Sequence, residues 1–174
     1  MWRPNRPRIL FGGIVLCLVP TLWAASTAAA EAVELTAAQE QAITRFVRSQ
    51  ERVRSRRDPA RNRIEYREGR RYAAGDVTGD GVADLAAQYT TEEGNNYRLF
   101  LVVFDGRSLK PLDHTRVGGK GLRDAELRRV VDRVVEIDTR DYAESDAACC
   151  PSVVGTTRYQ ITRGRLHEIV GRKR

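Results

Sequence analysis

The first clear pattern of apolar and polar positions is helical and follows Thr36. Apolar residues recur close to helical spacing at Ala42, Ile43, Phe46, Val47 and Val53. This spacing predicts an amphipathic helix with one apolar stripe. Thr36 and Gln39 have the spacing of a capping box, in which each side chain bonds a free amide of the first turn. Asp58-Pro59 should end the helix, because proline disfavours helical backbone at the residue before it.

Runs typical of β-strands fill the C-terminal part of the chain. Residues 84–90 and 97–105 are β-prone and are separated by EEGNN, which predicts a hairpin. The stretch RLFLVVF in the second run is almost continuously apolar, as expected of a strand buried on both faces. Residues 153–162 and 166–170 form another predicted pair of strands, joined across RGR.

One segment, residues 126–138, allows two interpretations. Leu127, Val130 and Val134 match a helical stripe. Valine and isoleucine also favour two short strands joined at Asp132-Arg133. We expect strands here, because the flanking segments are themselves predicted strands.

Together these elements predict an α+β fold, in which an N-terminal helix packs on a mainly antiparallel β-sheet or small barrel. We divide the chain into a leader (1–30), a basic amphipathic helix with its linker (31–71) and an antiparallel β domain (72–174). An acidic loop, residues 76–84, lies in the β domain. Its motif occurs once, which argues against a propeller of repeated blades.

The leader has the layout of a secretory signal peptide. Three arginines precede an apolar run at 9–23, and a tract of small residues ends with Ala28 and Ala30, which fit the A-x-A cleavage rule. Cleavage after Ala30 lowers the formal net charge from +7 to +4, because the three arginines are removed. An uncleaved membrane anchor is the alternative, since the segment nearly reaches spanning length. We expect a periplasmic or secreted protein with no membrane span after cleavage.

The acidic stretch GDVTGDGVAD is the most specific chemical signal in the chain. Oxygens at alternate positions converge when a loop coils tightly, and Gly79 and Gly81 permit such coiling. Calcium takes six to eight oxygen ligands, which this stretch supplies at alternate positions. The predicted calcium (Ca2+) ligands are the carboxylates of Asp76, Asp80 and Asp84, the hydroxyl of Thr78 and the backbone carbonyl of Val82.

The same stretch resembles the D-x-[DNT]-G-D-G-x-x-D calcium loops of FG-GAP and VCBS-type repeats, which lie in β-hairpins of secreted and cell-surface proteins. This resemblance covers the loop alone and implies the same five ligands, with Thr78 a weaker ligand than the usual Asp or Asn. An EF-hand loop fits less well, because Ala87 stands where that loop needs a bidentate glutamate. An aspartate-rich turn without metal is the alternative. Over more of the chain, the order GDxxGDGxxD, GGKG, CCPS is similar to small exported bacterial proteins, a resemblance that implies no activity.

Cys149 and Cys150 are adjacent and are the only cysteines outside the leader. Exported compartments are oxidising, so we expect a vicinal disulfide between them. Such a ring is strained, and strained disulfides tend to be the labile ones. Two free thiols or intermolecular bridges are the alternatives.

The polar face of the predicted helix is rich in arginine. Its arginines are Arg45, Arg48, Arg52, Arg54, Arg56 and Arg57. A basic face of this kind can bind the phosphates of nucleic acids or lipids. Glu51 and Asp58 are interleaved with the arginines and no aromatic platform accompanies them, so we interpret the face as solvated and expect no nucleic-acid binding.

The sequence as a whole favours an exported, calcium-stabilised binding module. We expect a monomer whose partner is a protein or a glycan of the cell envelope. No Ser-His-Asp order, nucleophile elbow or H-E-x-x-H motif is present, so we expect no catalytic role. Two alternatives stay open: a periplasmic enzyme or redox-active protein that uses the acidic loop or Cys149-Cys150, and a binder of anionic surfaces that uses the arginine-rich helix.

Overall fold

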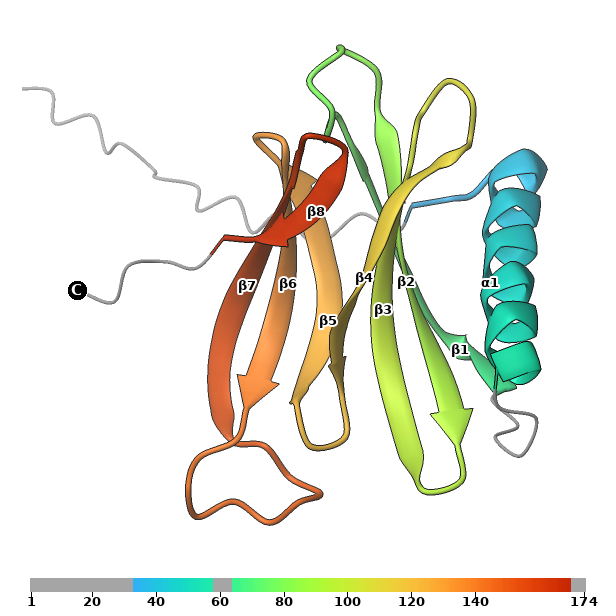
Figure 1. Ribbon diagram of the computed structural model, residues 1–174. Coiled ribbons are helices and arrows are strands. Elements are labelled where there is room, and N and C mark those ends of the chain that lie inside the picture. The colour runs from blue at the N-terminus through green and yellow to red at the C-terminus, as the bar shows by residue number, and fades with distance from the viewer. Residues whose placement is uncertain (1–32, 58–63, 170–174) are drawn as a thin grey trace, which may run out of the picture.

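The computed structural model describes residues 33–57 and 64–169, without the side chains of 53–57, and these ranges contain one helix and eight strands (Figure 1). The elements are α1 (Ala37–Arg57), β1 (Ile64–Gly75), β2 (Asp84–Glu93), β3 (Asn96–Phe104), β4 (Pro111–Gly119), β5 (Arg123–Val131), β6 (Val134–Asp141), β7 (Val153–Thr162) and β8 (Arg165–Glu168). The strands form one antiparallel sheet in chain order. The expected N-terminal helix and mainly antiparallel sheet are therefore confirmed.

The sheet is open and folds over between β4 and β5. These two strands share a single residue pair, Gly119 with Arg123, whereas β2 and β3 pair along their whole length. The fold brings β1 close to β5 and β4 close to β8. One half-sheet, β1–β4, therefore faces the other, β5–β8. Within the described residues β1 and β8 do not pair with each other, so the small barrel that the sequence allowed is not formed.

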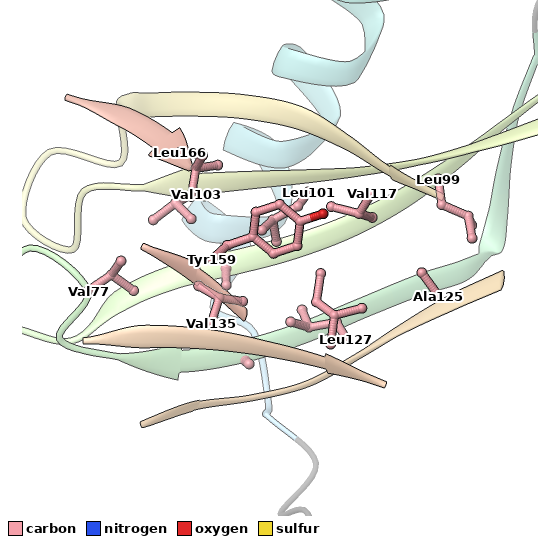
Figure 2. Close-up of a cluster of buried hydrophobic side chains, with 13 residues drawn as sticks. Val77, Leu99, Leu101, Val103, Val117, Ala125, Leu127, Val135, Tyr159 and Leu166 are labelled. Carbon is pink, nitrogen blue, oxygen red and sulfur yellow. The ribbon is translucent and has the colours of Figure 1, made fainter. Parts of the chain in front are cut away.

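Apolar side chains from both half-sheets meet in one inner core (Figure 2). Leu101 and Val103 of β3 are fully buried opposite Val135 and Ile137 of β6. Tyr159 of β7 fills the space between them, and its burial raises the pKa of the phenol. Removal of this apolar surface from water is the main force that holds the half-sheets together.

A buried glutamine also joins the two half-sheets. The side-chain amide of Gln88, on β2, donates to the carbonyl oxygen of Ala125 at 2.9 Å. Its oxygen accepts from the backbone amide of Leu127 at 2.6 Å. β4 supplies no backbone partner for this stretch of β5. The side chain of Gln88 takes the place that the peptide group of a neighbouring strand would have.

The helix covers the outer face of β2 and β3 and forms a second core. Ile43 and Val47 of α1 are fully buried against this face. Phe46 packs edge-on to the rings of Tyr89 and Phe104, with centroids 6.2 and 5.8 Å apart. β3 is thus buried on both faces, as its continuous apolar run predicts.

Most of the predicted element boundaries are confirmed. The capping box is present, with the Thr36 amide donating to the Gln39 side chain at 2.9 Å and the Gln39 amide donating to Oγ1 of Thr36 at 3.3 Å. Residues 126–138 form strands, joined by Asp132 and Arg133 with φ of +48° and +64°. β1 begins at Ile64, earlier than the expected strand region at 72–174.

Some predictions fall on residues outside the description. The leader, residues 1–30, and the helix stop at Asp58-Pro59 belong to this group, although α1 is described as far as Arg57. No helix in the described ranges is long and apolar enough to cross a membrane.

Candidate functional site

The acidic loop joins β1 to β2 at one end of the sheet (Figure 1). Gly79 and Gly81 have φ of +82° and +80°, a left-handed conformation that glycine adopts without steric cost. The chain coils at these two positions, so that backbone amides of the loop turn toward its own carboxylates.

The carboxylate of Asp76 lies inside this coil and accepts bonds from three backbone amides. Oδ1 accepts from Gly79 at 2.5 Å and from Asp80 at 3.1 Å, and Oδ2 accepts from Gly81 at 2.9 Å. The hydroxyl of Thr78 adds a longer bond of 3.4 Å to Oδ1. The hydrogen bonds from these amides hold the pKa of Asp76 below its ordinary value, and the bond from Gly81 has the largest effect. The carboxylate therefore stays charged.

Asp84 is buried at the start of β2, with 1% of its surface exposed. Its Oδ2 accepts from the amides of Val77 and Thr78 at 3.0 and 2.9 Å. Its Oδ1 accepts at 2.9 Å from the amide of Gly106, in the loop between β3 and β4. Glycine is required at 106, because a Cβ would lie 2.1 Å from the carbonyl oxygen of Ala83. Asp84 thus ties the acidic loop to its neighbour.

Two arginines from distant segments close over the acidic loop. Nε of Arg107 lies 3.2 Å from Oδ2 of Asp80, and Arg133 donates to the backbone carbonyl of Thr78 at 2.8 Å. Gly79 leaves room for Arg133, since a Cβ there would lie 2.3 Å from its Cζ. The sequence does not predict either contact, because both arginines lie in turns that only the folded sheet brings to the loop.

The five predicted calcium ligands lie in one loop, but the three carboxylates are not directed at one point. Asp76 and Asp84 bond backbone amides, while Asp80 bonds the amide of Val82 at 2.9 Å and pairs with Arg107. In the described ranges no group of three or more His, Cys, Asp or Glu side chains is placed to hold a metal ion. The donor chemistry suits calcium, but this arrangement does not form its shell, so calcium binding stays a prediction.

The loop between β6 and β7 lies at the end of the sheet opposite the acidic loop (Figure 1). We call residues 142–152 the disulfide loop. The sulfur atoms of Cys149 and Cys150 lie at disulfide distance, so the predicted vicinal pair is present. Both cysteines are exposed to solvent.

Hydrogen bonds within the disulfide loop fix its shape. Asp146 accepts from the amide of Ala143 at 2.8 Å, and from the amide and hydroxyl of Ser152 at 2.8 and 2.9 Å. These hydrogen bonds hold the pKa of Asp146 below its ordinary value, and the bond from the amide of Ala143 has the largest effect. The hydroxyl of Tyr142 donates to the carbonyl of Ala148 at 2.9 Å. The acidic loop is bonded to two other turns, whereas these bonds all stay inside the disulfide loop.

A hollow of about 630 Å³ lies on the outer face of β5, β6 and β7. Its polar lining consists of Asp124, Glu126, Arg128, Asp138, Thr139, Arg140 and Thr156. Arg128 pairs with Asp138 across the strands at 3.4 Å. Val154, 79% exposed, lines the hollow close to the disulfide loop. Acidic, basic and apolar groups therefore meet on this surface.

A row of charges beside the hollow links the same three strands. Glu136 of β6 is buried, with Arg129 of β5 at 2.8 Å on one side and Arg158 of β7 at 3.1 Å on the other. Hydrogen bonds from these guanidinium groups hold the pKa of Glu136 below its ordinary value, and the bond from Arg129 has the largest effect. The row satisfies the buried carboxylate, so we assign it a structural role.

The arginine-rich helix turns its polar side away from the sheet. Arg45, Arg48 and Arg52 are exposed, and within the described residues none of the three pairs with a carboxylate. The carboxylate of Glu51 instead accepts from the backbone amide of Glu65 at 3.0 Å. The side chains of Arg54, Arg56 and Arg57 lie outside the description.

His114 and the glycine-rich loop make structural contacts, whereas His167 is exposed. The ring of His114 lies edge-on to Phe46 with centroids 5.3 Å apart, and His167 lies on β8. The GGKG sequence connects β4 to β5, where Lys120 donates to the carbonyl of Asn95 at 2.9 Å.

The acidic loop stabilises one end of the sheet, while the hollow and the disulfide loop offer a surface at the other end. Comparisons of the chain with protein-family models, curated proteins and solved structures found no match.

Proposed function

We propose that the protein is an exported binding module that holds its partner in the hollow on β5, β6 and β7, beside the disulfide loop. One observation carries this proposal: α1 covers the outer face of β2 and β3, whereas no described element covers the outer face of β5, β6 and β7 (Figure 1). The hollow lies on this bare face. Export rests on the leader pattern of residues 1–30.

The chemistry of the hollow suits a partner of mixed polarity. Arg140 pairs with no carboxylate among the described residues, and its guanidinium group offers several donors. Among the described residues Asp124 bonds only the adjacent amide of Ala125, at 3.0 Å, and it keeps acceptor capacity. Val154 adds exposed apolar surface. Peptide groups of a protein segment or hydroxyl groups of a glycan would satisfy these side chains.

In this proposal calcium has a structural role. The acidic loop and the disulfide loop lie at opposite ends of the sheet, so an ion at Asp76, Asp80 and Asp84 would stabilise the end remote from the partner. We assign no catalytic role to these carboxylates, because they bond the backbone amides and Arg107.

The test is capture of an envelope partner by the mature protein, residues 31–174. We expect Arg140→Glu and Val154→Asp to abolish capture of the component that the wild type retains, at an unchanged melting temperature. The control is Lys110→Glu, which changes an exposed residue at the acidic-loop end of the sheet. This variant should capture the same component as the wild type does. Equal capture by the two hollow variants would place the binding surface elsewhere. A chemically altered partner would contradict a purely binding role.

A further inference from the structure

The outer side of α1 carries a regular row of arginines. Arg45, Arg48 and Arg52 are three and four residues apart, so they follow one another on successive turns of one helix face. The opposite face carries Ile43 and Val47, which are fully buried against the sheet. The row therefore points away from the protein body and spans about 10 Å along the helix axis, at 1.5 Å per residue.

The carboxylates of Glu51 and Glu65 are engaged elsewhere, and Glu40, which lines a groove with Arg45 and Arg48, forms no ion pair within the described residues. Glu51 accepts from the backbone amide of Glu65 at 3.0 Å. Glu65 is itself held by Arg70 at 2.6 Å and lies 3.9 Å from Arg67. Arg52 donates from Nε to the carbonyl oxygen of Arg48 at 3.3 Å, which leaves its other donors available. The positive charge of the row is thus not neutralised by the described part of the protein.

We propose that this arginine row binds the anionic headgroups of a phospholipid surface. Guanidinium groups form bidentate, charge-assisted bonds with phosphate oxygens, and a straight row matches the flat array of phosphates that a bilayer offers. The one aromatic residue of α1, Phe46, packs against the sheet, so the row has no ring on which nucleic-acid bases could stack. This binding uses a surface distinct from the hollow.

The position of the helix in the chain also favours a membrane. The apolar run of the leader ends at Trp23 and α1 begins at Ala37. A fully extended connection of this length spans roughly 45 Å at most, so a leader held in a membrane would keep the helix within that distance of the membrane. Because the apolar side of α1 is already packed on the sheet, the contact is electrostatic and lies at the surface, without insertion.

Co-sedimentation of the mature protein with vesicles tests the proposal. We expect binding to vesicles of phosphatidylcholine with 30% phosphatidylglycerol, loss of binding in 0.5 M salt, and none to phosphatidylcholine alone. Each basic residue near an anionic surface contributes about fivefold to partitioning. The triple change Arg45→Gln, Arg48→Gln, Arg52→Gln should therefore weaken binding by about a hundredfold.

A matched control separates the row from net charge. The change Lys110→Gln, Arg163→Gln, Arg165→Gln removes the same charge at other exposed positions outside the hollow and should weaken binding by less than about tenfold. A triple lysine variant of the row keeps the charge but loses the bidentate geometry, so it should bind more weakly than the wild type and more tightly than the glutamine variant. An equal loss in both glutamine variants would overturn the proposal, as would wild-type binding by the row variant. Binding to single-stranded DNA or a soluble sulfated polysaccharide, but not to vesicles, would overturn it in favour of another polyanion.

Discussion

The two half-sheets share the inner core but differ on their outer faces. On β2 and β3 the outward positions are apolar, for example Tyr89, Phe100 and Phe104, and α1 covers them. On β5 and β6 the outward positions are charged, for example Glu126 and Asp138, and they stay exposed. The outward residues therefore distinguish the face that the helix covers from the face that stays exposed.

The difference also separates two sources of stability. The covered face is held by apolar burial, which contributes about 25 cal/mol per Å² removed from water. The bare face is held by cross-strand ion pairs such as Arg128–Asp138, both of which are about half exposed. Exposed pairs of this kind contribute about 0–1 kcal/mol each. Substitutions on the two faces should therefore differ in cost by several fold.

The largest expected effect is on the covered face. Phe104→Ala removes a fully buried ring that packs against Phe46, and such a change costs about 3–5 kcal/mol of unfolding free energy. Its matched control, Val154→Ala on the bare face, should change stability by less than about 0.5 kcal/mol. Denaturant unfolding measures both. Similar losses for the two variants would mean that the bare face is covered in solution.

The connection between the half-sheets should be almost as sensitive. Gln88→Leu keeps the volume but leaves the carbonyl of Ala125 and the amide of Leu127 without their partner. A buried unsatisfied group costs about 1–3 kcal/mol, so we expect a loss of about 3 kcal/mol. Gln160→Leu, a half-buried control on β7, should cost less than about 1 kcal/mol. An equally small loss for Gln88→Leu would show that water replaces its two bonds.

Local pattern was enough to predict much of this fold. The capping box located the start of α1, and the apolar run of β3 indicated burial on both faces. The start of β1 was not predictable, because IEYREGRRYAAG is charged and a register shift between Tyr66 and Arg71 interrupts its alternation. The pairing of β1 with β2 decides its structure, and that pairing is not a local property.

The candidate sites show the same limit. The acidic loop and the cysteine pair were predictable, because each is a contiguous motif. The surroundings of the acidic loop were not, since Arg107 and Arg133 reach it from other turns. The hollow was not predictable either, because three strands supply its lining. Only the folded sheet brings these residues together.

The next prediction concerns the effect of calcium on stability through the acidic loop, at the end of the sheet opposite the disulfide loop. If Asp76, Asp80 and Asp84 bind the ion in the folded state only, stability rises by about 2.7 kcal/mol at a hundred times the dissociation constant. Asp80→Ala should abolish this rise. Without calcium it should cost less than about 1 kcal/mol, because it removes an exposed pair with Arg107. Thermal unfolding with calcium and with chelator measures both effects.

The control for calcium is Arg107→Gln, which removes the arginine and leaves every predicted ligand in place. It should keep the rise in melting temperature with calcium. If wild type and Asp80→Ala melt alike with and without calcium, the acidic loop is a turn that its own amides and two arginines hold closed.

A smaller, pH-dependent effect is expected on the bare face. Bonds from Arg129 and Arg158 lower the folded-state pKa of Glu136, so its contribution is full above the unfolded pKa, about 4.3. It is lost as pH falls through the folded-state pKa. Glu136→Gln should cost about 1–2 kcal/mol at pH 7, and the difference from wild type should shrink below about pH 4. Urea unfolding across this range measures the trend, and a constant difference would contradict it.

The disulfide loop, which borders the bare face, should contribute least to stability. Replacing Cys149 and Cys150 by serine opens a ring that constrains very little of the unfolded chain, so we expect a loss of about 1 kcal/mol. The bonds from Asp146 to Ala143 and Ser152 should keep the loop in shape. In the wild type, thiol titration of the denatured, unreduced protein should find no free thiol, and a non-reducing gel should show a monomer. Two titratable thiols, or a dimer that reductant converts to monomer, would show that the cysteines are not joined to each other in solution.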